Sequence, residues 1–312
     1  MNKLIIVSHV MPWELDQFIE LSTQLKRNSY HIENWEPGLD VVLDITLNLS
    51  SDIIDWDKSK LPKQYFEDKF QSILKIYDWC EVNDKKIESG NYGCVTARVD
   101  ATYNYDDCLM MWIDPDVILS DLTLMVYKTV ISGFSGSKLD MFVLNPQTSK
   151  WGDYSWDAIT HDRHINKPYG FHKDFDVYEI NKFTFDDYEK ISVYENNPTK
   201  FAGGLCATFS DKLLKKLFNY LPKDVPGYGI EDYYIMVGID TLKKLGYDIK
   251  QYVIKNLMVA ENIKYNNLIE YTKNYLSLKV TRQNQRDETT RIQKLIFELS
   301  MDKLIREERK KL

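Results

Sequence analysis

The sequence has few cysteines and no long apolar run. Its 312 residues include four cysteines, Cys80, Cys94, Cys108 and Cys206, and no two of them form a CxxC pair. That spacing argues against a zinc site or a disulfide framework and favours reduced, buried thiols in a cytoplasmic protein. No stretch approaches the roughly 18 apolar residues of a membrane span, and the N-terminus lacks a signal-peptide pattern. We therefore expect no integral membrane segment.

The chain is also short of basic charge, except at its C-terminal end. It carries 40 basic and 47 acidic side chains, for a net charge of −7, yet residues 273–312 alone have a net charge of +5. A body this acidic argues against a protein whose whole surface follows nucleic acid. The basic segment fits an amphipathic cap on the domain, or an arm that binds a phosphate backbone or an anionic membrane surface.

Strand and helix patterns alternate along the chain. Apolar runs predict strands at residues 4–10, 41–49, 108–113, 140–144 and 247–259, and helical spacing predicts helices at 14–27, 62–77, 90–104, 122–131, 212–220 and 232–245. This alternation predicts an α/β fold with a mainly parallel central sheet flanked by helices.

Two further segments interrupt or follow this pattern. Residues 150–198 form a polar and aromatic insertion, in which Trp151 and Trp156 either stack on a ligand or anchor the insertion to the core. From residue 262 onward we expect a charged, helical extension. Its apolar stripe consists of Ile292, Leu295, Ile296, Leu299, Leu304 and Ile305.

The strand at 108–113 is followed by two carboxylates, Asp114 and Asp116, separated by Pro115. In open α/β sheets, ligands bind at the carboxyl ends of strands, and carboxylates there suit a hard divalent cation shared with phosphates. A plain acidic turn would have the same sequence, because Asp-Pro often begins a turn. The surrounding motifs favour the functional interpretation.

Those motifs follow one another in a definite order. Ala97 and Arg98 precede the Asp114/Asp116 pair, Gly203 and Gly204 follow it, and a Gly-Ile-Glu-Asp segment then ends in Glu231 and Asp232. Over roughly residues 3–262, this set resembles glycosyltransferases of the GT-A fold, which use nucleotide sugars. The resemblance implies a GT-A-like catalytic domain at 1–262, with the insertion near its acceptor side and a basic helical extension at 263–312.

The resemblance also implies roles for these residues. Asp116 would bind Mn²⁺ or Mg²⁺, Asp114 would contact the donor ribose or the metal shell, and Arg98 would contact the donor phosphates. An exposed helical charge, or a pair with Asp100, is the alternative for Arg98. Asp232 would be the base that takes the acceptor proton, with Glu231 supporting the acceptor. Acids at a helix N-terminus are also favoured by the helix dipole alone.

The remaining candidates rest on weaker patterns. Metal-dependent members often supply a late histidine ligand, but this chain has Glu261 there, an oxygen ligand suited to Mg²⁺ or Mn²⁺ or else a surface carboxylate. Gly203 and Gly204 would let backbone approach the acceptor, or would form a simple turn. On the donor side, Ser8 ends the first strand, and Asp44 either contacts the base or faces solvent at a strand edge.

The sequence thus predicts an inverting, metal-dependent glycosyltransferase with a UDP-type donor and a glycan or polysaccharide precursor as acceptor. A DNA acceptor with hydroxymethylated bases is the alternative suggested by the basic extension. A nucleotidyltransferase is less well supported, because residues 8–13 contain no glycine for a phosphate loop. A sugar-nucleotide-binding module without turnover is the non-enzymatic alternative.

Overall fold

The computed structural model describes residues 3–33, 38–90, 93–134, 140–148, 192–195, 205–223, 225, 231–262, 274–279 and 282–311. Most of the insertion at 150–198 therefore lies outside the described residues, as do Trp151, Trp156, Gly203 and Gly204. The described residues contain no helix long and apolar enough to cross a membrane.

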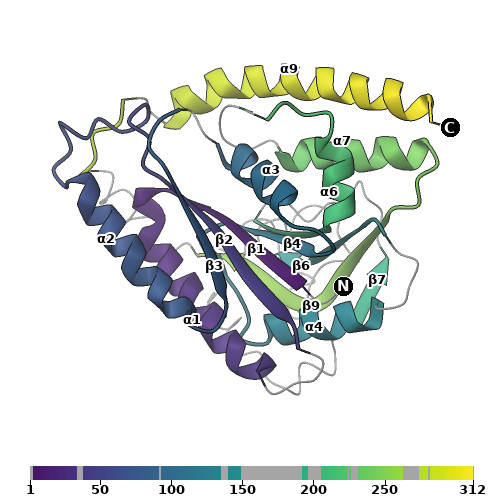
Figure 1. The fold of residues 1–312 in the computed structure, drawn as a ribbon, viewed down its shortest axis with the longest axis horizontal. Coiled ribbons are helices and arrows are strands. Elements are labelled where there is room, and N and C mark those ends of the chain that lie inside the picture. Colours follow the sequence, from purple (N-terminus) through teal and green to yellow (C-terminus); the bar gives the residue numbers. More distant parts are fainter. Residues whose placement is uncertain are drawn as a thin grey trace, which may run out of the picture.

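One mixed sheet forms the centre of the molecule (Figure 1). Its strands are β1 (Lys3–Val10), β2 (Asp40–Asn48), β3 (Glu81–Ile87), β4 (Leu109–Ile113), β5 (Val117–Ile118), β6 (Phe142–Thr148), β7 (Ser192–Glu195), β8 (Cys206–Ser210) and β9 (Lys250–Glu261). They are ordered β3-β2-β1-β4-β8-β6-β9-β5, with β7 also paired to β9.

Six of these strands run in the same direction. β1 pairs in parallel with both β2 and β4, β2 with β3, and β6 with β9, whereas β8 lies antiparallel between β4 and β6. The carboxyl ends of β1, β2, β4 and β9 therefore lie at the same edge of the sheet. This confirms the predicted α/β class with a mainly parallel sheet.

Helices cover both faces of the sheet. They are α1 (Leu15–Ile32), α2 (Lys63–Leu74), α3 (Cys94–Asn104), α4 (Thr123–Phe134), α6 (Asp211–Phe218), α7 (Glu231–Lys244) and α9 (Arg282–Arg309), with short 3-10 turns η1 (Pro12–Glu14) and η2 (Lys75–Tyr77). α1, α2 and α4 lie on one face, and α3, α6, α7 and α9 lie on the other (Figure 1).

The alternation of side chains along the strands builds a separate core on each face. In β1, Leu4 and Ile6 pack in the core under α1, whereas Ile5 and Val7 pack in the core under α3. On the second face, α6 and α7 approach closely at Gly238, where an added Cβ would lie 2.5 Å from a methyl group of Leu217. The predicted end of α7 is confirmed by Gly246, whose φ of +92° suits glycine.

The C-terminal segment differs from the prediction in two ways. Residues 274–279 are not helical: the amide of Lys279 donates to the carbonyl of Ile53, and Leu278 forms an antiparallel bridge with Ile54. The predicted apolar stripe of α9 is also partly wrong, because Ile292, Leu295 and Leu299 are exposed. The buried side consists of Gln293, Phe297, Ser300, Leu304 and Glu308.

Glu308 fixes the end of α9 to the body. Its carboxylate accepts hydrogen bonds from Lys216, Lys311 and the hydroxyls of Tyr220 and Tyr247. Burial alone would raise the pKa of Glu308, but these donors lower it to about 2. The C-terminal helix is thus held by a satisfied buried charge as well as by apolar packing.

Several smaller differences from the prediction remain. The sequence pattern did not predict β3, β5, β7 or β8 as strands, and the helix predicted from residue 90 begins only at Cys94. Gly90 instead has a φ of +89° in the preceding loop. The four cysteines are free thiols, as expected: Cys94, Cys108 and Cys206 are buried, and Cys80 is half-buried.

Candidate functional site

Three of the predicted site residues, Arg98, Asp114 and Asp116, lie where β4 ends. Asp114 follows β4 directly, and its amide donates a 3.0 Å hydrogen bond to the carbonyl of Leu205, just before β8. Asp116 follows two residues later and leads into β5. This edge is where ligands bind in open α/β sheets.

Arg98 connects α3 to this edge. Its guanidinium lies over the ring of Trp112, 5.0 Å from the centroid, and one nitrogen lies 2.9 Å from Asp114 Oδ1. The side chain of Arg98 is only 5% exposed, whereas that of Asp114 is 43% exposed. The alternative of a solvent-exposed helical charge at Arg98 is therefore wrong. The pair places a buried cation beside a carboxylate that solvent, or a ligand, can reach.

The end of β9 lies against the second carboxylate position. The amide of Asn262 donates to the carbonyl of Asp116 at 2.6 Å, and Val117 pairs with Glu261 in an antiparallel register. The backbone of Glu261 is therefore close to the Asp114–Asp116 turn. The side chain of Glu261 lies outside what the structure describes.

A divalent cation fits the chemistry of this turn. Asp114 and Asp116 supply the hard oxygen donors that Mg²⁺ and Mn²⁺ prefer. Among the described side chains, no group of three or more His, Cys, Asp and Glu is arranged to hold a metal. Glu261, whose backbone pairs with Val117, stays the third ligand that the sequence predicts, and its side chain is outside the described set.

His9 and Asn48 also lie at this edge. The strand pattern places both near the ends of the first two strands, but it favours Ser8 and Asp44 as the donor contacts. In the structure His9 Nε2 lies 3.3 Å from Asn48 Nδ2. Burial, together with the positive charge of Arg98, lowers the pKa of His9 to about 3, so its imidazole is neutral near pH 7. The sequence feature that favours His9 over Ser8 is the alternation of side chains along β1. This alternation directs His9, and not Ser8, toward the face that carries α3.

Ser8 lies on the opposite face. It shares that face with Leu4 and Ile6, in the core under α1, and is 2% exposed. Within the described part of the chain, its hydroxyl has no hydrogen-bond partner. The structure therefore does not bring Ser8 together with Arg98 and Asp114.

Asp44 is buried in the interior of the sheet. β2 lies between β1 and β3, so the alternative of a solvent-facing strand edge is wrong. The hydroxyl of Tyr105 donates to Asp44 at 3.1 Å, and the ammonium of Lys85 lies 3.7 Å away. Burial raises the pKa of Asp44, and both of these partners oppose that rise. Its described contacts tie the end of α3 to the sheet.

The predicted base, Asp232, lies in the first turn of α7. Its Oδ1 accepts the amide of Tyr233 at 2.7 Å, and a carboxylate here is stabilised by the helix dipole. The side chain of Glu231 is not described. The hydroxyl of Thr96 bonds both the amide and the carbonyl of Val225, which ties the chain before α7 to the first turn of α3.

The thiol of Cys206, which Asp114 influences, is unsuited to nucleophilic chemistry. Burial, and the charge of Asp114, raise the pKa of Cys206 to about 12. A thiol in this state is protonated near pH 7 and therefore unreactive. The chemistry of the edge thus rests on carboxylates, a guanidinium and a neutral imidazole.

No family model and no curated protein matches this sequence. Among solved structures, TarS of S. aureus is similar at 12% identity over 92% of this chain and 42% of that one, with a TM-score of 0.47. This chain therefore spans less than half the length of TarS. A mannosyltransferase of Pyrobaculum calidifontis, in complex with GDP-Man and Mn²⁺, is similar at 12% identity over 86% of this chain and 59% of that one, with a TM-score of 0.46.

An inositol-1-phosphate CTP transferase of T. maritima is also similar, at 10% identity over 88% of this chain and 96% of that one, with a TM-score of 0.41. Likenesses this distant do not identify a reaction or a substrate for this chain. The chemistry has to be inferred from the residues at the edge of the sheet.

Proposed function

We propose that this chain is a glycosyltransferase that moves a sugar from a nucleoside-diphosphate donor, of the UDP type, to a hydroxyl acceptor with inversion. The observation that carries the proposal is the Arg98–Asp114 pair at the carboxyl end of β4, with Asp116 beside the end of β9. A guanidinium next to two carboxylates matches a diphosphate that also needs a cation.

The proposed reaction is a single displacement. Asp232 takes the proton of the acceptor hydroxyl while that oxygen attacks the anomeric carbon of the donor sugar. The bond from this carbon to the diphosphate oxygen breaks, and the nucleoside diphosphate leaves with the bonding electrons. Glu231 supports the acceptor, and Gly203 and Gly204 let backbone come close to it.

The donor side uses the charges at the strand ends. Arg98 orients the diphosphate, and Asp114 holds the nucleotide ribose or the metal shell. Mn²⁺ or Mg²⁺, held by Asp116 with Asp114 and Glu261, would act as a Lewis acid that neutralises the charge of the departing diphosphate. His9, which is neutral, adds a hydrogen-bonding group at the same edge.

The first test is binding and hydrolysis of nucleotide sugars. Purified protein with Mn²⁺ is titrated with UDP- and GDP-sugars, and nucleoside diphosphate release is measured with and without acceptor. We expect tight binding of one donor and slow hydrolysis without acceptor. If no nucleotide sugar binds or is hydrolysed, the proposal is wrong.

Two variants separate the proposed roles. We expect Asp116→Asn to weaken donor binding in the presence of Mn²⁺, and Asp232→Asn to bind donor normally but to lose transfer. Asp140→Asn is a matched control, because that carboxylate is 70% exposed and pairs only with the surface residue Lys212 in the described structure. Normal transfer by Asp232→Asn would reject the assignment of the base.

The acceptor is proposed to be a glycan or polysaccharide precursor. Duplex DNA with hydroxymethylated bases is tested separately by a gel shift at low and high salt, because phosphate contacts weaken steeply with salt. A salt-sensitive shift, followed by transfer to that DNA, would replace the glycan acceptor with DNA.

A further inference from the structure

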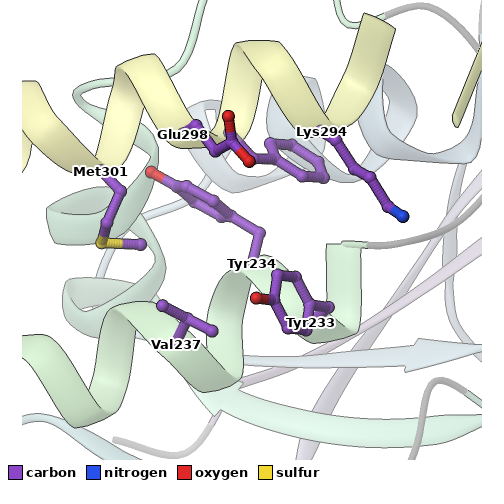
Figure 2. A pocket seen from close by; sticks show the side chains of 7 residues that line it. Tyr233, Tyr234, Val237, Lys294, Glu298 and Met301 are labelled. Atoms are coloured by element: carbon purple, nitrogen blue, oxygen red, sulfur yellow. The ribbon is translucent and has the colours of Figure 1, made fainter. Parts of the chain in front are cut away.

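A cavity of about 560 Å³ lies between α7 and α9. Figure 2 shows the side chains of Tyr233, Tyr234 and Val237 rising from α7 toward α9, and those of Lys294, Glu298 and Met301 reaching it from α9. The volume is within the range of about 300–1,000 Å³ that is typical of small-molecule sites. The proposed mechanism makes no use of this space.

The inner wall of the cavity is apolar. It is formed by Val237, Phe297 and Met301, together with the ring of Tyr234, which packs 4.8 Å from the ring of Phe297. The hydroxyl of Tyr234 donates to the carbonyl of Leu217 at 3.0 Å. Such a wall suits an aryl ring or an alkyl chain, because the hydroxyls of a buried sugar would lose their hydrogen bonds to water.

The polar groups of the cavity are exposed. Tyr233 is 55% exposed, and Lys294 and Glu298 are also exposed. An apolar interior with a few polar groups at the surface is the pattern of a site for a ligand with an apolar body and a polar end. Tyr233 directly follows Asp232, so this cavity and the proposed base share the first turn of α7.

We propose that the cavity binds the apolar aglycone, an aryl group or an alkyl chain, of an acceptor whose reacting hydroxyl lies at Asp232. The position of the reacting hydroxyl at Asp232 rests on the proposed function, because Asp232 acts as the base only in that reaction. The apolar ligand class of the cavity does not. Together they narrow the acceptor to an amphiphilic glycoside or alcohol.

The test compares three glycosides with the same sugar and different aglycones. Methyl, n-octyl and para-nitrophenyl β-glucosides are titrated into the full chain by calorimetry, without donor and below the concentration at which octyl glucoside forms micelles. We expect the octyl glucoside, the nitrophenyl glucoside or both to bind at least about tenfold more tightly than the methyl glucoside, because burial of apolar surface is favourable. The stronger of the two identifies the aglycone as alkyl or aryl.

Two variants test the location. Tyr233→Ala removes an exposed ring from the solvent-facing side of the cavity, and Met301→Gln adds a polar group to its apolar inner wall. Each should reduce the aglycone preference about fivefold or more. Leu295→Ala is the matched control, because Leu295 lies on α9 but is 57% exposed and does not line the cavity. Equal binding of all three glucosides, or a preference unchanged in both variants, overturns the proposal.

Separate titrations keep this failure distinct from failure of the proposed function. Binding of a nucleotide sugar with no aglycone preference leaves the glycosyltransferase standing and rejects the cavity as the aglycone site. The opposite result is also possible: both variants reduce the aglycone preference, but the protein neither binds nor hydrolyses a nucleotide sugar. That result supports the apolar ligand class of the cavity and rejects Asp232 as the base.

Discussion

Two buried charges on the same face of the sheet are arranged differently. Glu308 is fully buried, and its carboxylate is surrounded by ammonium and hydroxyl donors from Lys216, Lys311, Tyr220 and Tyr247. Arg98 is also buried, but its partner Asp114 is 43% exposed. In the first cluster, which we call the closed cluster, the carboxylate itself is closed to solvent although its partner Lys311 is 56% exposed; in the second, the open pair, the carboxylate reaches solvent at the end of β4.

The difference separates a structural charge from a candidate ligand-binding charge. Removing a buried carboxylate that several donors satisfy leaves those donors without their acceptor, so it lowers the stability of the fold. A charge pair with one accessible member can exchange part of its interaction for a ligand. The comparison predicts that a substitution at Glu308 lowers the free energy of unfolding, whereas a substitution at Arg98 lowers catalytic activity.

Among the charged residues, the largest effect is expected at the closed cluster. Glu308→Gln leaves the ammonium groups of Lys216 and Lys311 without their carboxylate. We expect the free energy of unfolding to fall by about 3 kcal/mol, measured by urea denaturation. Donor binding by the folded protein should be unchanged, and a loss of donor affinity as large as that of stability would break the comparison.

The same cluster predicts an acid transition. The pKa of Glu308 in the folded protein, about 2, lies below the ordinary value of 4.5. Its contribution to stability is therefore complete above about pH 4.5 and is lost as the pH falls toward 2. Wild type and Glu308→Gln should converge in stability over this interval, as followed by thermal unfolding.

A second effect is expected at the open pair. Arg98→Gln removes the guanidinium that stacks on Trp112 and pairs with Asp114. If the proposed function is correct, kcat/KM should fall about 100-fold, which equals about 2.7 kcal/mol of transition-state stabilisation. The control is Lys212→Gln, which removes an exposed cation and should leave kcat/KM within about twofold of wild type.

Much of the fold was predictable because several of its strands contain continuous apolar runs. The five residues of β4 are all apolar, and the position of Asp114 and Asp116 after them followed directly. β3 was missed because its sequence, Glu-Val-Asn-Asp-Lys-Lys-Ile, has only two apolar residues and is partly exposed along its length. An edge strand of this kind is stabilised mainly by its neighbour.

The site was predictable in part, for a different physical reason. Local sequence identifies which residues follow a strand, but it does not say which faces and partners they meet. The pairing of Arg98 with Asp114, and the choice of His9 over Ser8, depend on where α3 packs. The error in α9 has the same origin: Glu308 is buried because ammonium and hydroxyl groups of other elements satisfy its carboxylate, and hydrophobicity alone does not predict such a contact. Nothing in the described structure explains the burial of Gln293, whose side-chain amide has no hydrogen-bond partner among the described residues.

A smaller effect is expected from the neutral histidine at the open edge. The pKa of His9, about 3 when folded, lies below the ordinary 6.5, so the unfolded chain binds a proton first as the pH falls. Between pH 6.5 and 5.5, wild type should lose about 1 kcal/mol more stability than His9→Gln. An NMR titration should also find no His9 transition between pH 5 and 8. Parallel stability curves would mean that the edge is more open than the structure indicates.

The smallest effect is expected on the outer side of α9. Leu295 belongs to the apolar stripe that the sequence pattern gives this helix, yet it is 57% exposed. Leu295→Ala should therefore change the free energy of unfolding by no more than about 0.5 kcal/mol, whereas Phe297→Ala, two residues away and buried, should cost about 3 kcal/mol or more. Urea denaturation of both variants measures this contrast. A cost at Leu295 comparable to that at Phe297 would mean that the outer side of α9 is covered in solution.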